Sequence, residues 1–302
     1  MPRLLEHGFV PTVANLETAR AVAAAARRPT AIYVKVDSGL GRLGVPLGNA
    51  VEFVKQVVAV PGIVVEGIYT HLPFGDPAGL EWARSRLGEF RTVLRALEQA
   101  GIGVPVTQAL SSAGILARLD HGCTAVCPGH LLYGLRAGSA AIGDPEPFQP
   151  VLRAIRTRLI HVTRNPTARA VGMGGRRVLP GGAVTGVVPI GAGDGYRSAK
   201  TGTAAMVLRG CRVPVLGVSL EHTTVDLSEI PDPTIGDEVV VLGGDGEARI
   251  ALEELAEWQQ VRPLDVLTAF SGRMPIAICR GRPSDSRPAG ALPTGKAGQT
   301  RP

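Results

Sequence analysis

The chain has 302 residues, of which 45 % are hydrophobic, and this is enough for two domains with real cores. The net charge is +6, and half of it comes from the last 22 residues, where four basic side chains face one acid: Arg282, Arg287, Lys296, Arg301 and Asp285. The body of the chain is therefore nearly balanced. Only 4 % of the residues are aromatic, so we expect no nucleic-acid binding.

The sequence shows no targeting signal, so we expect a cytoplasmic protein without membrane association. No run of about 18 apolar residues is present for a transmembrane helix, and residues 1–7 are too short and too polar for a signal peptide. The cysteines are sparse and fit reduced thiols: Cys123, Cys127, Cys211 and Cys279. From Gly281 onward the chain is rich in Pro, Gly, Ser and Thr, which predicts a disordered tail over 281–302.

Short apolar runs alternate with helical patterns in the first part of the chain. The expected strands are 9–14, 31–37, 64–70, 104–110 and the start of 125–135. The expected helices are 16–26, which Asn15 can cap, then 49–60, 80–100 and 113–119. This order predicts a domain over 1–140 with about five β/α units and a parallel sheet.

The pattern of predicted elements changes after Asp144. Val-rich strands separated by Gly pairs are expected at 154–163, 183–190, 204–208, 213–220 and 238–242, and helices return only at 252–258 and 264–270. This pattern predicts a separate, mainly antiparallel β domain over 145–280.

The stretch from Ala31 to Gly44 has the strongest functional pattern. A buried strand delivers Lys35 and Asp37 to a Gly-rich turn that carries Arg42. In a barrel of parallel strands, active sites lie where the strands end. An arc of five strands leaves two unpaired edges, so an open doubly wound sheet is an alternative interpretation.

Six segments resemble motifs of the alanine racemase family, in the same order: residues 37–44 (DSGLGRLG), 65–71 (VEGIYTH), 111–113 (SSA), 128–135 (PGHLLYGL), 190–195 (IGAGDG) and 214–220 (PVLGVSL). The resemblance implies a pyridoxal phosphate (PLP) enzyme of fold type III that acts on a small amino acid as a homodimer. It also implies the C-terminal part of a (β/α)8 barrel followed by a β domain.

The resemblance assigns cofactor-binding roles to five residues. His71 would stack on the cofactor ring, and Cys127 stands where the family has an arginine facing the pyridine nitrogen. Ser112, with the backbone at Gly129 and His130, would receive the phosphate. Taken from the residues alone, His71 is equally well a turn histidine, and Ser112 belongs to a Ser-Ser pair typical of a helix N-cap.

The resemblance also assigns Arg42 to orienting catalytic groups, with Lys35 as the supporting lysine on its strand. From the alternation alone, Lys35 shares a face with Asp37 and could simply pair with it. The lysine that carries the cofactor in the family lies in an earlier strand motif, which this sequence lacks. We therefore expect an N-terminally truncated, divergent member that starts inside the barrel.

Other family positions are also changed. The opposing tyrosine is replaced by Met173, which cannot accept a proton. Ala192, residues 219–221 and Gly272 replace three further motif positions. The sequence predicts that this polypeptide alone does not interconvert L- and D-alanine.

Three alternatives stay open. The chain is a divergent PLP-dependent isomerase whose true start lies upstream, or a non-catalytic partner that pairs with a chain supplying the other barrel half. The third is a non-PLP protein with zinc at a local cluster of possible ligands: His121, Cys123, Cys127 and His130. Of the four lysines, Lys35, Lys55, Lys200 and Lys296, only Lys35 sits at a strand end where it could take the Schiff-base role.

Overall fold

The computed structural model divides the chain into two compact units, residues 1–151 and 152–302. It describes residues 1–143, 150–175, 177–200, 204–244, 248–270 and 272–279. The expected disordered tail over 281–302 lies outside the described residues. The two units are described separately below.

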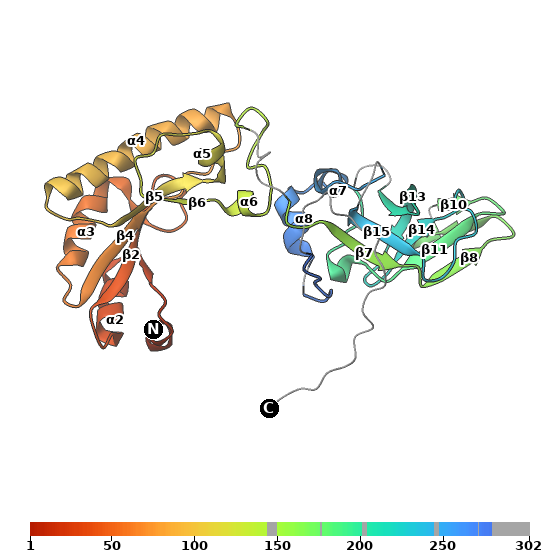
Figure 1. The fold of residues 1–302 in the computed structure, drawn as a ribbon, viewed down its shortest axis with the longest axis horizontal. Coiled ribbons are helices and arrows are strands. Elements are labelled where there is room, and N and C mark those ends of the chain that lie inside the picture. The colour runs from red at the N-terminus through yellow and green to blue at the C-terminus, as the bar shows by residue number, and fades with distance from the viewer. Residues whose placement is uncertain (144–149, 176, 201–203, 245–247, 271, 280–302) are drawn as a thin grey trace. The chain divides into compact units, whose positions relative to one another are not determined.

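Unit 1 (residues 1–151) is built on a parallel sheet with helical crossovers (Figure 1). Its strands lie in the order β1 (Thr12–Val13), β2 (Thr30–Asp37), β4 (Ile63–Tyr69), β5 (Val106–Ser111) and β6 (Ala125–Cys127), and β3 (Val45–Pro46) pairs with the end of β2. Its helices are α1 (Pro2–Glu6), α2 (Leu16–Ala25), α3 (Ala50–Val58), α4 (Pro77–Gln99), α5 (Ser112–Leu116) and α6 (Gly129–Leu132), with a 3-10 turn at Leu47–Asn49. The predicted α/β class is confirmed.

Local signals explain where the helices begin. The Asn15 side chain accepts a hydrogen bond of 2.7 Å from the Thr18 N–H, which caps α2 as predicted. Asp76 caps α4 in the same way through Gly79 N–H at 2.7 Å, and Pro77 occupies the first helical position. The predicted start of α4 at residue 80 was late, because its first turn has few apolar residues.

Alternation along β2 gives the sheet two different faces. Ile32, Val34 and Val36 are fully buried and belong to the apolar core that α2, α3 and α4 share with this sheet. Figure 1 shows these helices on one face of the sheet. Tyr33 and Lys35 alternate with the core residues, so they project from the opposite face.

Unit 2 (residues 152–302) is a curled antiparallel sheet, as the sequence predicts. Its strands are ordered β7 (Ala154–Arg158), β15 (Glu238–Gly243), β12 (Ala205–Leu208), β13 (Cys211–Val218), β14 (Thr223–Asp226), β11 (Val184–Val188) and β8 (His161–Arg164). The separate hairpin β9 (Arg169–Val171) and β10 (Arg177–Leu179) was not predicted, nor was β14. Two 3-10 turns, η2 (Met173–Gly175) and η3 (Ala192–Asp194), and two helices, α7 (Leu252–Gln259) and α8 (Pro263–Ala269), complete the described part.

The single strand expected over 154–163 is wrong. The chain leaves β7 after Arg158 and enters β8 at His161, and these two strands lie at opposite ends of the seven-strand order. Leu159 is 1 % exposed and belongs to the core of unit 2, so this buried residue anchors the change of direction. The hydrophobic pattern of the sequence does not reveal the break between β7 and β8.

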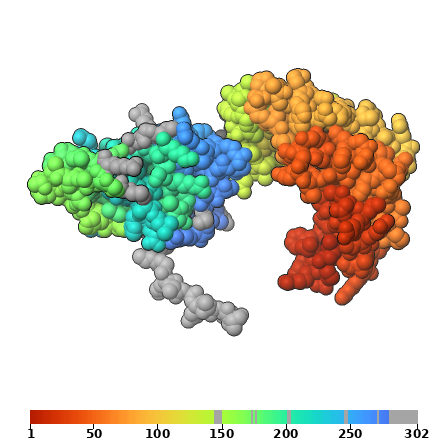
Figure 2. Space-filling model, turned by 180° about the vertical axis from the view of Figure 1, so that it is seen from behind, coloured from red at the N-terminus to blue at the C-terminus, as the bar shows by residue number. Residues whose placement is uncertain are grey.

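The surface of unit 1 carries several apolar side chains near its N-terminus. Phe9 is 62 % exposed and Val10 is 43 % exposed, just before β1. In the space-filling view this red segment stands at the surface of unit 1 (Figure 2). Among the described helices, none has the length and apolar character that crossing a membrane requires.

Candidate functional site

A row of polar side chains crosses the sheet of unit 1 close to the carboxyl ends of its strands. The register places Lys35 of β2 opposite Tyr69 of β4, Tyr69 opposite Gln108 of β5, and Gln108 opposite Ala125 of β6. One row further along, Ser111 pairs with Cys127. The expectation that parallel strands deliver polar groups to one edge is therefore met.

Hydroxyl groups tie the strand ends to one another. Ser38 Oγ and Thr70 Oγ1 lie 2.7 Å apart and are buried, which joins the segments after β2 and β4. Ser111 donates to the Leu72 carbonyl at 3.2 Å, which joins β5 to the segment after β4. These hydrogen bonds fix the edge at which the candidate site lies.

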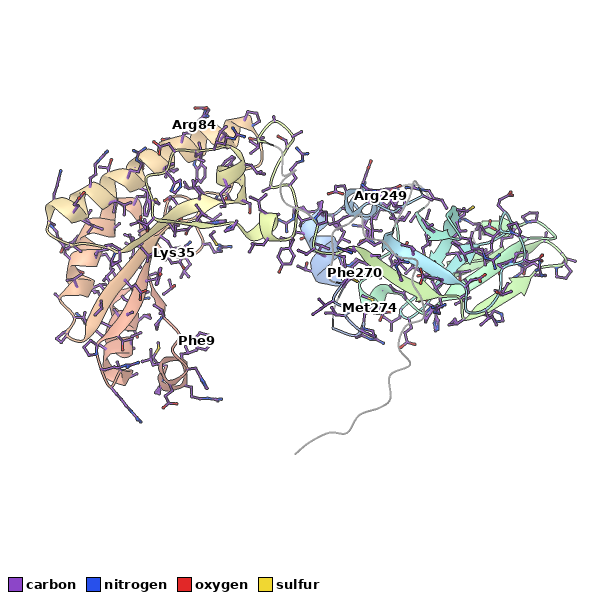
Figure 3. All side chains as sticks on the ribbon, in the orientation of Figure 1. Phe9, Lys35, Arg84, Arg249, Phe270 and Met274 are labelled. Atoms are coloured by element: carbon purple, nitrogen blue, oxygen red, sulfur yellow. The ribbon has the colours of Figure 1, made fainter. Side chains whose placement is uncertain are left out.

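Lys35 is the buried cation of this edge, with 6 % of its surface exposed. Its Nζ lies 4.4 Å from the centre of the Tyr69 ring, and Figure 3 labels it beside β2. Burial and the positive charge of Arg42 lower the pKa of Lys35, and they outweigh Asp37 and Cys127, which act in the opposite direction.

Asp37 is used by the loop and not by Lys35. Its Oδ1 accepts a hydrogen bond of 3.0 Å from the Gly39 N–H, and its Oδ2 accepts one of 3.0 Å from the Gly41 N–H. The carboxylate therefore closes the Gly-rich turn that carries Arg42, which is exposed. None of the ion pairs between described residues includes Lys35, so the Lys35–Asp37 pairing suggested by the sequence pattern is not formed.

His71 follows β4 and is half-buried at the same edge. Burial lowers its pKa, and the charges of Lys35, Arg42 and His130 lower it further. The imidazole is therefore held neutral at pH 7, which suits a ring that stacks on an aromatic ligand and does not suit a cationic anchor.

The remaining predicted residues lie on β6 and the two short helices beside it. Ser112 is 1 % exposed, and its Oγ accepts a hydrogen bond of 3.2 Å from the Leu131 N–H, which joins α5 to α6. Gly129 is exposed, and within the described part of the unit a Cβ added there would meet no atom within 4 Å. The backbone at Gly129 is therefore accessible to a phosphorylated aromatic ligand, with Cys127 exposed two residues earlier and Arg42 acting on His71 at the same edge.

The four possible zinc ligands do not gather around one point. His121 Nδ1 accepts a hydrogen bond of 3.0 Å from the Cys123 N–H, and Cys123 Sγ donates to the His121 carbonyl at 3.5 Å. Burial raises the pKa of the Cys123 thiol, which disfavours the thiolate that a metal needs. No three His, Cys, Asp or Glu side chains are placed to hold a metal ion in the ranges that the structure covers.

In unit 2 the motif over residues 190–195 forms a structural turn. Asp194 is 9 % exposed, and its Oδ2 accepts a hydrogen bond of 2.9 Å from the Gly191 N–H. Arg273 Nε lies 3.5 Å from the other carboxylate oxygen. Met173 falls in the 3-10 turn η2, between β9 and β10.

The sequence pattern did not identify Tyr69 and Thr12 as parts of the edge. Thr12 Oγ1 lies 3.2 Å from the Tyr69 hydroxyl, and the Tyr33 ring meets the Tyr69 ring edge-on, with centroids 6.3 Å apart at 67°. Tyr69 is inside the 65–71 motif, and its place opposite Lys35 follows only from the sheet register. That register was the missing signal.

Comparison with known proteins assigns both units to one family. The family signature "Alanine racemase, N-terminal domain" matches residues 1–137, and "Alanine racemase, C-terminal domain" matches residues 152–278. An alanine racemase of Desulfosudis oleivorans is 30 % identical over 297 residues, which cover 94 % of this chain and 76 % of the relative. One of Halothermothrix orenii is 30 % identical and covers 90 % of this chain and 72 % of the relative.

Solved structures agree with the sequence comparisons. The crystal structure of alanine racemase from E. faecalis superposes with a TM-score of 0.81 at 27 % identity, over 91 % of this chain and 74 % of that one. Alanine racemase from Streptomyces coelicolor gives 0.80 at 25 % identity, over 91 % and 73 %. The two units thus correspond to the two domains of a family of PLP-dependent isomerases. The chain belongs to the alanine racemase family.

Proposed function

We propose that this chain keeps the cofactor-binding layer of an alanine racemase but does not by itself interconvert L- and D-alanine. The observation that carries the proposal is the joint replacement of both proton-transferring groups. The family's lysine motif is not among the residues of this chain, and Met173 stands at the tyrosine position. Racemisation needs a base on each face of the substrate, and a thioether cannot serve as one.

The edge of unit 1 supports the binding half of the proposal. PLP would be held by His71 against its ring, by Ser112 and the backbone at Gly129 and His130 at its phosphate, and by Cys127 near the pyridine nitrogen. When bound, PLP would supply an electron sink for a carbanion beside the amino group. Arg42 would orient the bound amino acid by its fixed charge.

The test is alanine racemisation by the purified chain with added PLP, followed by chiral chromatography. We expect no D-alanine above the level of PLP alone, while the Halothermothrix orenii relative at equal concentration gives a clear signal. Met173→Tyr restores only one of the two bases, so it should remain inactive. D-alanine formation by the unmodified chain, abolished by Arg42→Ala, would overturn the proposal.

A second candidate is a non-catalytic subunit that associates with another polypeptide. Among described residues β1 pairs only with β2, so its other edge is free to pair. The apolar side chains Phe9 and Val10 lie just before β1 and are 62 % and 43 % exposed. Such an edge favours pairing with a second copy of this chain or with a chain that completes a barrel.

Light scattering coupled to size-exclusion chromatography tests this candidate. Val10→Glu should convert an associated species into a monomer. Val58→Glu is the matched control, because Val58 is 45 % exposed at the end of α3, away from β1 in the chain. Equal effects of both substitutions, or a monomer at every concentration of the unmodified chain, would rule out this edge as a self-association surface.

A further inference from the structure

Two groups lie close to the Lys35 side chain. The first is the Tyr69 ring, whose centre lies 4.4 Å from Nζ. The second is the backbone of Gly44, which has a φ of +136°, and a Cβ there would come 3.1 Å from Lys35 Cγ. These neighbours restrict the rotamers of Lys35, which lowers the entropy that a ligand would have to remove.

The wall against which the amine rests is itself fixed. Thr12 Oγ1 holds the Tyr69 hydroxyl at 3.2 Å, and Tyr33 packs edge-on against the Tyr69 ring. Tyr33 can lie across β4 only because residue 67 is glycine, since a Cβ there would overlap the Tyr33 ring. Three strands thus cooperate to keep one aromatic face under the Lys35 amine.

Among the described residues, no carboxylate forms an ion pair with this amine. Both Asp37 oxygens accept backbone hydrogen bonds. Burial, followed by Arg42, lowers the pKa of Lys35. The free-base amine, which is the nucleophile, is therefore more populated at Lys35 than at an exposed lysine.

We propose that Lys35 is the carbonyl-reactive amine of this chain and forms an imine with a phosphorylated aromatic aldehyde of the PLP class. The inference rests on the proposed cofactor binding and adds the group that would hold the cofactor covalently. The Nζ lone pair attacks the aldehyde carbon. Both amine hydrogens leave with the aldehyde oxygen as one water, so the step needs no oxidant or reductant.

Positive charge near this amine suits the phosphate of such an aldehyde. Arg42 acts electrostatically on both Lys35 and His71, and His130 acts on His71, so these groups share one edge. The guanidinium can attract the dianion towards this edge, where Ser112 and the backbone at Gly129 and His130 would hold it. Imine formation should therefore be faster with PLP than with pyridoxal, which lacks the phosphate.

The experiment is reduction with borohydride after incubation of the full chain with PLP, followed by peptide mass mapping. We expect the reduced adduct on the peptide that carries Lys35, at about ten times the occupancy found at Lys55, Lys200 or Lys296. Lys35→Arg should remove this adduct and the imine absorbance, whereas Lys55→Arg, in the exposed part of α3, should leave both unchanged. Mapping of the unmodified chain decides the question even if Lys35→Arg fails to fold.

Adducts spread evenly over the lysines, or none at Lys35, would overturn the assignment. Stoichiometric PLP that dialyses away and leaves no reducible adduct would overturn it too, while the proposed cofactor binding would stand. Equal labelling by pyridoxal and PLP removes the phosphate part of the argument. Racemisation is measured separately, so failure of the proposed function does not alter the mass spectrum.

Discussion

The carboxylates and bases whose pKa is shifted are arranged differently in the two units. In unit 2 they form pairs near the surface, as Arg212 does with Glu254 at 2.5 Å and Arg262 with Asp265 at 2.7 Å. The hydrogen bond from Arg212 lowers the pKa of Glu254, and the one from Arg262 lowers that of Asp265. In both of these pairs the acid has its base, so these charges support the fold.

In unit 1 the two shifted bases, Lys35 and His71, take part in none of the ion pairs between described residues. Burial is the first cause of the lowered pKa of both Lys35 and His71, and neighbouring positive charges add to it. An unpaired, desolvated base is costly to the fold and useful to chemistry. The contrast suggests that unit 1 keeps a reactive edge, whereas unit 2 is a scaffold.

The largest expected effect tests the scaffold. Gly195 has a φ of +100° after η3, and a Cβ there would overlap the carbonyl of Ala269. Gly195→Ala should therefore lower the free energy of unfolding of unit 2 by about 3 kcal/mol or more. Gly210 has a φ of +77° with open space, so Gly210→Ala should cost only about 1 kcal/mol.

Each unit contains one tryptophan, Trp82 in α4 and Trp258 in α7, which allows the two to be followed separately. Urea unfolding of Gly195→Ala in a Trp82→Phe background reports on unit 2, and in a Trp258→Phe background on unit 1. The unit 1 midpoint should not move. Equal shifts in both backgrounds would mean that the units unfold together, and the division into scaffold and reactive edge would lose its support.

The next prediction concerns how much the buried amine of Lys35 destabilises unit 1. Lys35→Met keeps the volume and removes the buried amine, so unit 1 should gain about 1–2 kcal/mol. Lys55→Met, at an exposed position, should change stability by less than about 0.5 kcal/mol. A loss of stability on Lys35→Met would show that the amine is satisfied by a partner, and would contradict the contrast.

The same variant has a pH signature. Because the folded pKa of Lys35 lies below the unfolded value of about 10.4, the unfolded chain binds the proton more tightly. The free energy of unfolding of unit 1 should rise as the pH increases from the folded pKa of Lys35 to the unfolded one. Below the folded pKa, the buried charge of Lys35 destabilises the unit by its full amount. Urea titrations by Trp82 fluorescence at several alkaline pH values should show this rise in the unmodified chain and lose it in Lys35→Met.

Two tyrosine hydroxyls extend the comparison, and the one in unit 2 is an exception to the pairing seen there. Tyr196 is 1 % exposed, its hydroxyl has no partner among the described residues, and burial raises its pKa. Tyr196→Phe should leave unit 2 unchanged or stabilise it by up to about 1 kcal/mol. Tyr69→Phe breaks the bond to Thr12 and should destabilise unit 1 by about 1 kcal/mol. A loss of about 2 kcal/mol for Tyr196→Phe would indicate a water-mediated partner.

Sequence reasoning predicted the elements better than the contacts. An apolar, β-branched run located β2, and a side-chain cap located α2, because both depend on neighbours within a few residues. The change of direction at Leu159 was missed, since a buried residue between two strands has the same apolar pattern as one inside a strand. Local order is therefore readable from the sequence where a local signal exists.

The candidate site shows the same limit. Motifs placed Lys35, Arg42 and His71 at one edge, whose position follows from the parallel order of the strands. The bond from Thr12 to Tyr69 spans 57 positions in the chain and depends on the register of three strands, one of which has a bulge. Whether Asp37 pairs with Lys35 or with the loop depends on loop geometry that no spacing rule contains.

The smallest expected effect tests whether the pairs of unit 2 are ordinary surface pairs. The Arg212 and Glu254 side chains are 43 % and 27 % exposed, so the coupling energy of a double-mutant cycle with Arg212→Gln and Glu254→Gln should be about 0.5 kcal/mol. The folded pKa of Glu254 lies below its unfolded value of about 4.3, so the contribution is present above pH 4.3 and is lost as pH falls through the folded pKa. Trp258 fluorescence at pH 7 and at about pH 3 measures both quantities. A coupling energy above about 2 kcal/mol would be typical of a desolvated ion pair. Unit 2 would then contain a buried charged site, and the contrast with unit 1 would be lost.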